Sequence, residues 1–307
     1  TDLSETSAAG GHFKYTPPTG FKACQNDNVK SLDSFQTALN WTKNLDATDN
    51  WMVFDRVRGP YLDWHTNSIN QQATNYNTLQ RFLKHGQQIG NDNEVNRDLD
   101  KFTSFNWYME TTGSGTANEV GGINTTRTLV DANAGISMGI FEGTGSASTI
   151  GHGLGVAPKF IILKGLDNSS YSTVCYHYGV ASDPETDYIQ LNSTDDRADD
   201  VGMWNDTAPT STVFSVGTGS SVNKSGETMA YYAFAEILGY SKFGFYEGTG
   251  VTTIGGTPLI YTGFRPQLVI IKNVEANSTY WMAMSSDRPD DSPQTPAGIT
   301  IQNPFQN

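Results

Sequence analysis

The sequence contains few cysteines, few basic residues and no long apolar run, and each scarcity excludes a class of protein. Cys24 and Cys175 are the only cysteines, too few for a disulfide framework or a cysteine metal site. Free thiols suit a reducing compartment or a fold that needs no disulfide. No apolar stretch reaches the roughly 18 residues of a membrane-spanning helix. No basic, apolar leader opens the sequence either, so we expect neither a membrane span nor a secretory signal.

Basic residues are outnumbered, 19 against 32 acidic ones, which gives a formal net charge of −13. No stretch of the chain concentrates Lys or Arg. Because DNA, RNA and anionic membrane surfaces repel such a chain, we expect no nucleic-acid partner and no membrane insertion.

Helix-forming residues are also scarce. Only 36% of the 307 residues are hydrophobic and 17% charged, and Gly, Ser, Thr, Asn and Gln dominate the remainder. Thr, Tyr, Phe, Val and Ile recur in short bursts, which favours strands and turns. The one weak helical candidate, TNYNTLQRFLKHG at residues 74–86, aligns with a strand elsewhere in the chain, so an all-β fold is predicted.

What the sequence does contain is an internal repeat. MGIFEGTG, ending at Gly145, matches FGFYEGTG, ending at Gly250, and GVAPKFIILK, ending at Lys164, matches GFRPQLVIIK, ending at Lys272. WMVFDR, at residues 51–56, is a fainter copy of KFIILK, and residues 82–107 parallel residues 214–234. We therefore divide the chain into a first unit at 31–125, a second at 126–238 and an incomplete third at 239–307, with residues 1–30 outside them.

Strand patterns within the units define the expected fold. YYAFAEI, at residues 231–237, alternates bulky and small side chains, while KFIILK and QLVIIK are apolar on both faces and are predicted to be central strands covered on both sides. Turn signals recur every roughly 8–12 residues. The prediction is tandem antiparallel β-sandwich repeats of jelly-roll-like type.

The glycine-rich stretch at residues 143–164 resembles a phosphate or metal site at first sight. No helix pattern follows the glycines and no Lys-Ser/Thr pair is present, so a hairpin turn is the better interpretation. His152 has Gly256 at the matching place in the third unit, and we expect no metal role for it. The five histidines are scattered along the sequence: His12, His65, His85, His152 and His177.

Carboxylates cluster in three loops, at Asp183–Asp187, Asp195–Asp200 and Asp287–Asp291. Paired carboxylates could serve a glycosidase, or their oxygens could bind Ca²⁺. No EF-hand spacing is present and Asp-rich loops are usually solvated turns, so we expect no catalytic residue and no cofactor, with Ca²⁺ as the alternative.

Aromatic residues make up 11% of the chain, and some lie in or beside polar turns, where an exposed ring could stack on a sugar. Rings in such places more often cover a core or fill a subunit interface. The candidates are Trp64, Tyr171, Trp204, Tyr280 and Trp281. The Asn-x-Ser/Thr sequences, which begin at Asn40, Asn124, Asn168, Asn192, Asn205, Asn223 and Asn277, are interpreted as turn chemistry.

Several of these stretches carry a resemblance to known proteins. HFKYTPPTGFKAC, at residues 12–24, resembles the last strand of concanavalin- or SPRY-type lectin-like domains in large virion proteins of marine bacteriophages. SLDSFQTALNW, WMVFDRVRG, IGNDNEVN and FNWYM resemble the repeated β domain of unknown function that follows it, and the second and third units resemble further copies.

The resemblance implies a virion structural protein, a tail fibre or other receptor-facing appendage. It further implies a homotrimer that contacts other virion proteins and binds host cell-surface glycans without turnover, and it supplies no catalytic or ligand residues. A capsid or tail decoration protein and a glycan-degrading tailspike are the alternatives. In the first unit QTALNWTKNLDATDN replaces the GTG-type turn, so a remodelled hairpin is expected there.

Overall fold

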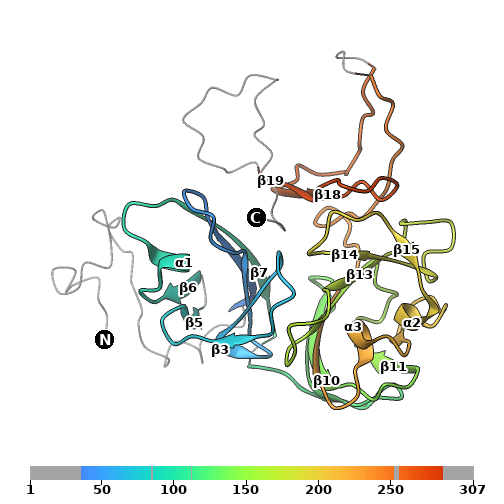
Figure 1. Ribbon diagram of the computed structural model, residues 1–307, viewed down its shortest axis with the longest axis horizontal. Helices are drawn as coiled ribbons and strands as arrows, with labels where there is room; N and C mark the ends of the chain where they lie inside the picture. The colour runs from blue at the N-terminus through green and yellow to red at the C-terminus, as the bar shows by residue number, and fades with distance from the viewer. Residues whose placement is uncertain (1–35, 84–85, 112, 252–255, 286–307) are drawn as a thin grey trace.

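The computed structural model describes residues 36–83, 86–111, 113–251 and 256–285 (Figure 1). Within these ranges every pairing between named strands is antiparallel, and the three helices span four residues each. None of them is long and apolar enough to cross a membrane. The predicted all-β antiparallel fold is confirmed.

The first unit forms a five-stranded sheet in the order β4-β3-β2-β1-β7. Its strands are β1 (Gln36–Asn44), β2 (Met52–Asp55), β3 (Gly59–His65), β4 (Ala73–Thr74) and β7 (Phe102–Met109). As expected, the first hairpin is remodelled: β1 turns directly into β2, and β7 pairs with the other side of β1.

The second unit forms an eight-stranded sheet in the order β15-β14-β13-β12-β17-β10-β9-β8. The strands are β8 (Thr116–Asn118), β9 (Thr125–Asp131), β10 (Ile136–Glu142), β12 (Phe160–Gly165), β13 (Val174–His177), β14 (Asp187–Gln190), β15 (Ala198–Asp199) and β17 (Thr228–Phe234). Here the last strand, β17, lies between β10 and β12, and β8 joins the sheet although it precedes residue 126.

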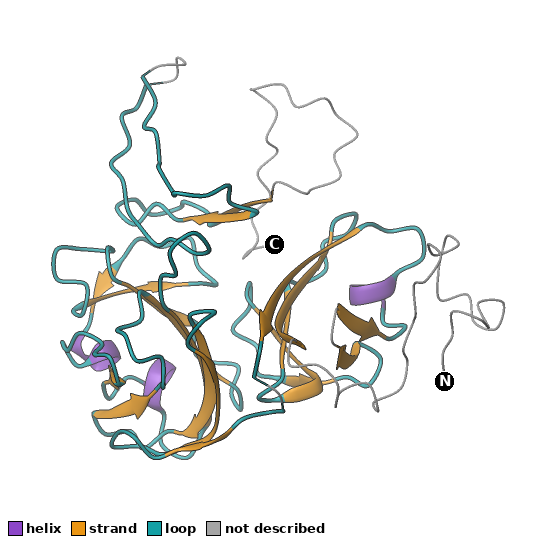
Figure 2. Ribbon diagram, turned by 180° about the vertical axis from the view of Figure 1, so that it is seen from behind, coloured by secondary structure: helices purple, strands orange, loops and turns teal. Residues whose placement is uncertain are grey.

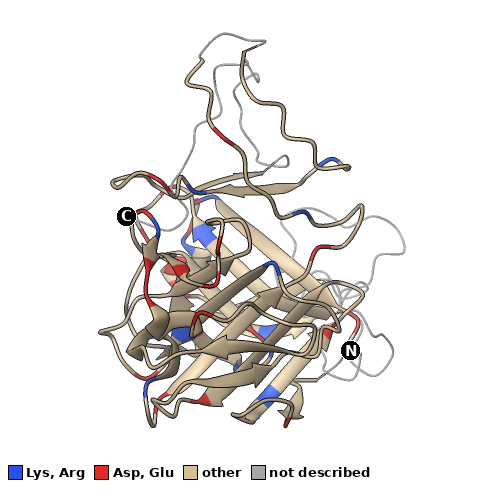
Figure 3. Cartoon of the chain, turned by 90° about the vertical axis from the view of Figure 1, so that its right-hand side faces the viewer, with Lys and Arg blue, Asp and Glu red and all other residues tan. Residues whose placement is uncertain are grey.

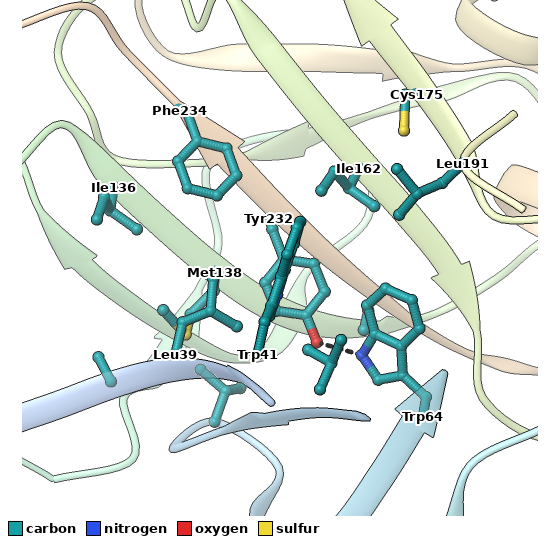
Figure 4. Packing of buried hydrophobic residues seen from close by; sticks show 14 of the residues in the cluster. Leu39, Trp41, Trp64, Ile136, Met138, Ile162, Cys175, Leu191, Tyr232 and Phe234 are labelled. Carbon is teal, nitrogen blue, oxygen red and sulfur yellow. Dashed lines mark hydrogen bonds between the residues drawn. The ribbon is translucent and has the colours of Figure 1, made fainter. Parts of the chain in front are cut away.

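The two large sheets face each other and enclose one hydrophobic core (Figures 1 and 2). Leu39, Trp41 and Trp64 from the first sheet pack against Met138 and Tyr232 from the second (Figure 4). Burying a large apolar side chain contributes roughly 1.5–3 kcal/mol. The first and second units are therefore the two halves of a single sandwich core.

A smaller layer covers the outer face of each sheet. Behind the first sheet, Met52 and Phe54 of β2 contact the β5 (Leu79–Leu83) and β6 (Gly86–Ile89) hairpin and α1 (Asn93–Asn96). Behind the second lie β11 (Ser148–Gly151), α2 (Val201–Trp204), β16 (Val213–Val216) and α3 (Ser220–Asn223). These layers explain why WMVFDR and KFIILK are apolar on both faces. Residues 74–86, the weak helical candidate, contain β5 and the start of β6 in place of a helix.

The described residues of the third unit form two strands, β18 (Leu268–Ile271) and β19 (Met282–Ser285), which pair with each other. The prediction that QLVIIK is a central strand covered on both sides is wrong. β18 has one strand partner among the described residues, and its side chains are only partly buried. The strand expected at residues 12–24 lies outside the described residues.

Candidate functional site

Four buried polar groups at the contact between the two sheets form one network. Asp55 Oδ2 accepts hydrogen bonds from Tyr232 Oη at 2.7 Å and from Arg58 Nε at 2.5 Å. Trp64 Nε1 donates to Tyr232 Oη at 2.9 Å (Figure 4). Arg58 also donates through Nη2 to the Val53 carbonyl at 2.9 Å.

This network is closed to solvent, because Asp55, Arg58, Trp64 and Tyr232 are all buried. Burial lowers the pKa of the Arg58 guanidinium, but the charge of Asp55 and further neighbours outweighs it, so the net shift is upward and the guanidinium stays charged. Burial raises the pKa of Tyr232, whose hydroxyl therefore remains protonated. The network holds the first unit to the second and offers no surface to a substrate.

His152 follows β11, and its buried side chain forms hydrogen bonds with the main chain around the glycine-rich stretch. It is fully buried, its Nδ1 accepts from the Leu154 N–H at 3.2 Å, and its Nε2 lies 3.2 Å from the Thr210 carbonyl. Burial lowers its pKa, which favours the neutral ring. Both ring nitrogens contact main-chain groups, and no group of three His, Cys, Asp or Glu in the described ranges is placed to hold a metal ion.

The first two carboxylate loops are held by local contacts. The Asp183 carbonyl accepts from the Thr186 N–H, Asp187 lies 3.7 Å from Arg197 Nη1, and Asp200 Oδ1 accepts from Gly202 N–H to cap α2. Acidic residues are dispersed over loops and strand ends in the view of Figure 3. The third loop, Asp287–Asp291, lies outside the described residues.

Three of the five proposed sugar-stacking rings are core residues. Trp64, Trp204 and Trp281 are buried, so stacking on a ligand is ruled out for them. Tyr171 is half-buried, and Tyr280 alone is exposed. The polar turns beside the tryptophans suggested exposure, but the rings turn inward under those loops.

An aromatic pair that the sequence interpretation missed lies at the edge of the first sheet. The ring centroids of Tyr61 and Tyr76 are 5.2 Å apart with an interplanar angle of 53°. Tyr76 is 70% exposed and Tyr61 is half-buried. The pairing of Leu62 with Thr74 brings the two tyrosines together, so a β3–β4 hairpin was the signal that could have identified them.

An amide-rich turn fixes this pair. The Asn75 N–H donates to the Tyr61 carbonyl at 2.8 Å, and Asn75 Nδ2 donates to Asp92 at 2.8 Å. Tyr61 has φ of 70°, a left-handed conformation that is uncommon for a tyrosine and that the surrounding contacts must hold. Exposed Asn77 lies beside Tyr76, so ring faces and amide groups are offered together. Such a surface suits a sugar, which presents C–H faces and hydroxyls.

One protein-family model matches nearly the whole chain. Residues 8–301 match the family described as Domain of unknown function (DUF7483). The chain belongs to the DUF7483 family. No curated protein and no solved structure matches this DUF7483 chain.

Proposed function

We propose that this DUF7483 chain is a structural protein of a phage virion, a tail fibre or other receptor-facing appendage, that binds host-surface glycans without turnover. The observation that carries the glycan part is the Tyr61–Tyr76 pair, in which Tyr61 on β3 contacts Tyr76 in a turn fixed by Asn75, beside exposed Asn77. The virion part rests on the resemblance of the repeat stretches to phage β domains.

The buried ionisable side chains are engaged with other groups of the protein, which supports a binding role. Asp55, Arg58 and Tyr232 are engaged with one another, and His152 is engaged with main-chain groups. Cys175 is a buried free thiol whose pKa burial raises, which disfavours the reactive thiolate. The potentially reactive groups named here stabilise the sandwich.

Weak glycan binding at one aromatic pair becomes tighter when several copies of the pair bind the same surface. A homotrimeric fibre would present the Tyr61–Tyr76 surface several times, and linked sites can raise avidity by roughly 10²–10⁴ over a single site. A single chain is therefore expected to bind a host glycan weakly and a fibre to bind it tightly.

The glycan contact is tested by titrating the full chain with fragments of host-surface polysaccharide in a calorimeter. Tyr76→Ala should weaken binding about tenfold, equivalent to about 1.4 kcal/mol, without changing stability. Tyr280→Ala, which removes another exposed ring, is the matched control and should bind as the parent does. Equal binding by all three proteins would refute the assignment.

The virion location is tested by negative-stain imaging of particles labelled with an antibody to this chain. Label at the tail supports an appendage, whereas label over the capsid shell contradicts it and favours a decoration protein. Release of reducing ends from the polysaccharide during incubation would contradict binding without turnover and favour a glycan-degrading tailspike.

A further inference from the structure

The turn at residues 75–78, which carries one ring of the aromatic pair, is packed against the loop at residues 90–93. The Asp92 N–H donates to the Asn77 carbonyl at 2.9 Å. A Cβ at Gly90 would overlap the same Asn77 carbonyl, so glycine at this position permits the close approach of the two segments. The turn and the loop therefore form one fixed surface beside the tyrosines.

This surface presents side-chain amides whose hydrogen-bonding groups are not used inside the protein. Asn77, Asn91 and Asn93 are exposed, and their carboxamides form no hydrogen bond within the described part of the chain. Each carboxamide has two N–H donors and one carbonyl acceptor, and a sugar hydroxyl both donates and accepts. These amides can therefore pair with the hydroxyls of a sugar in either sense.

Two acidic side chains help to fix the same surface. Asp92 accepts hydrogen bonds from Asn75 Nδ2 through Oδ2 and from the Glu94 N–H through Oδ1, both at 2.8 Å. Glu94 Oε1 accepts from Asn50 Nδ2 at 3.3 Å. Both acidic residues are half-buried directly behind the exposed amides in sequence and in space. A ligand that stacks on Tyr76 is therefore held near negative charge.

The sign of this charge favours one class of sugar over another. A sugar carboxylate about 5 Å from a protein carboxylate at a wet surface loses roughly twofold to fourfold in affinity at moderate ionic strength. An uncharged sugar of the same shape loses nothing. With Asp92 and Glu94 both near the surface, we expect a preference of about threefold or more for the uncharged sugar.

We propose that the Tyr61–Tyr76 site takes uncharged sugar residues and discriminates against acidic ones such as uronic acids. This inference rests on the proposed glycan-binding function and specifies the substrate class of that site. The C–H face of the sugar stacks on Tyr76 and its hydroxyls pair with the Asn77 carboxamide. Asp92 and Glu94 disfavour a carboxylate on the bound sugar.

Matched pairs of oligosaccharides provide the probe. Fragments of bacterial polysaccharides that contain uronic acid are immobilised before and after chemical reduction of each carboxyl group to an alcohol, and the full chain is titrated over both forms. The reduced, uncharged form should bind about threefold or more tightly than the acidic form, and higher ionic strength should narrow the difference. Tyr76→Ala should weaken binding of the uncharged form about tenfold.

A charge reversal in the turn tests the cause of the preference. Asn77→Lys places an ammonium beside Tyr76 and leaves the main-chain hydrogen bond to Asp92 in place. It should bind the acidic form about threefold or more tightly than the parent does. Asn133→Lys, at an exposed asparagine in the turn between β9 and β10, changes the net charge equally and is the matched control. It should keep the preference of the parent, and thermal melts check that both variants fold.

The outcomes separate this inference from the function on which it rests. Binding that depends on Tyr76 but is equal or tighter for the acidic form would overturn the substrate class and leave glycan binding intact. An equal gain for the acidic form in Asn77→Lys and Asn133→Lys would also overturn it, because the preference would then come from net charge alone. If Tyr76→Ala weakens binding of neither form, the proposed glycan function fails, and the inference fails with it.

Discussion

Lys164 is a charged group in an apolar interior, and its replacement by methionine should stabilise the protein. The residue lies on β12 and is fully buried, yet no hydrogen-bond acceptor in the described part of the chain contacts its Nζ. Burial lowers the pKa of Lys164 from 10.5 to about 8. At neutral pH the amine is still mostly protonated, so the folded state carries a desolvated ammonium.

The magnitude follows from that shift in pKa. A decrease from 10.5 to about 8 corresponds to about 3 kcal/mol disfavouring the charged amine in the folded state. Methionine keeps a flexible apolar stem of similar length, so little packing is lost. We expect Lys164→Met to raise the free energy of unfolding by about 1–3 kcal/mol, or the Tm by roughly 2–4 °C per kcal/mol.

Urea unfolding at several pH values provides the assay. Because the folded pKa lies below the unfolded one, the stability of the parent should rise as pH increases from about 8 to 10.5, and Lys164→Met should lose this slope. Lys272→Met is the matched control at the repeat counterpart. Lys272 Nζ donates to two carbonyls, so its loss should destabilise. Destabilisation by Lys164→Met of more than about 1 kcal/mol would refute the reasoning, since the ammonium would then have a favourable partner.

Three further predictions concern the sandwich. Tyr232→Phe removes the donor to Asp55 and should cost about 2–3 kcal/mol in urea unfolding, and an unchanged midpoint would show that this hydrogen bond does not stabilise the sandwich. Burial and the nearby Lys159 lower the pKa of His177 to about 4, so stability should fall by about 2 kcal/mol as pH drops from 6.5 to 4. His177→Asn, which keeps an acceptor for Gly179 N–H, should flatten that profile in thermal melts. Gly139→Ala should destabilise the protein by about 1–3 kcal/mol because the added Cβ would lie 2.7 Å from the Arg127 carbonyl oxygen. Gly244→Ala, where no atom lies within 4 Å of the added Cβ, should change the Tm little. Equal changes in Tm for the two variants would refute this explanation.

Much of the fold follows from local pattern. The burst WMVFDR predicts β2, KFIILK predicts β12 and YYAFAEI predicts β17, because β-branched and aromatic residues in short runs favour a pleated, buried backbone. The repeat also predicts matching strands in successive units. The pattern does not state which sheet covers which face, so the shared core of the first and second units emerges only in three dimensions.

The candidate site was less predictable. Trp204 and Trp281 lie beside polar turns in sequence, yet their rings enter the core, since neighbours along the chain do not determine the direction of a side chain. Tyr61 lies on β3 and Tyr76 in the turn that follows β4, and the two meet only through the β3–β4 hairpin. In the third unit, QLVIIK carries the pattern of a central strand, but among the described residues β18 pairs with one neighbour, β19.

The polar network between the sheets fixes the offset of one sheet on the other, which the apolar contacts alone do not fix. Leu39 and Met138 would pack almost equally well after a small slide of one sheet over the other, because apolar contact is non-directional. The bond from Tyr232 to Asp55 and the bond from Trp64 to Tyr232 form at one offset only. Any other offset would leave the Asp55–Arg58 pair buried with a lost donor, which is strongly unfavourable. We infer that this network selects the single arrangement of the two units.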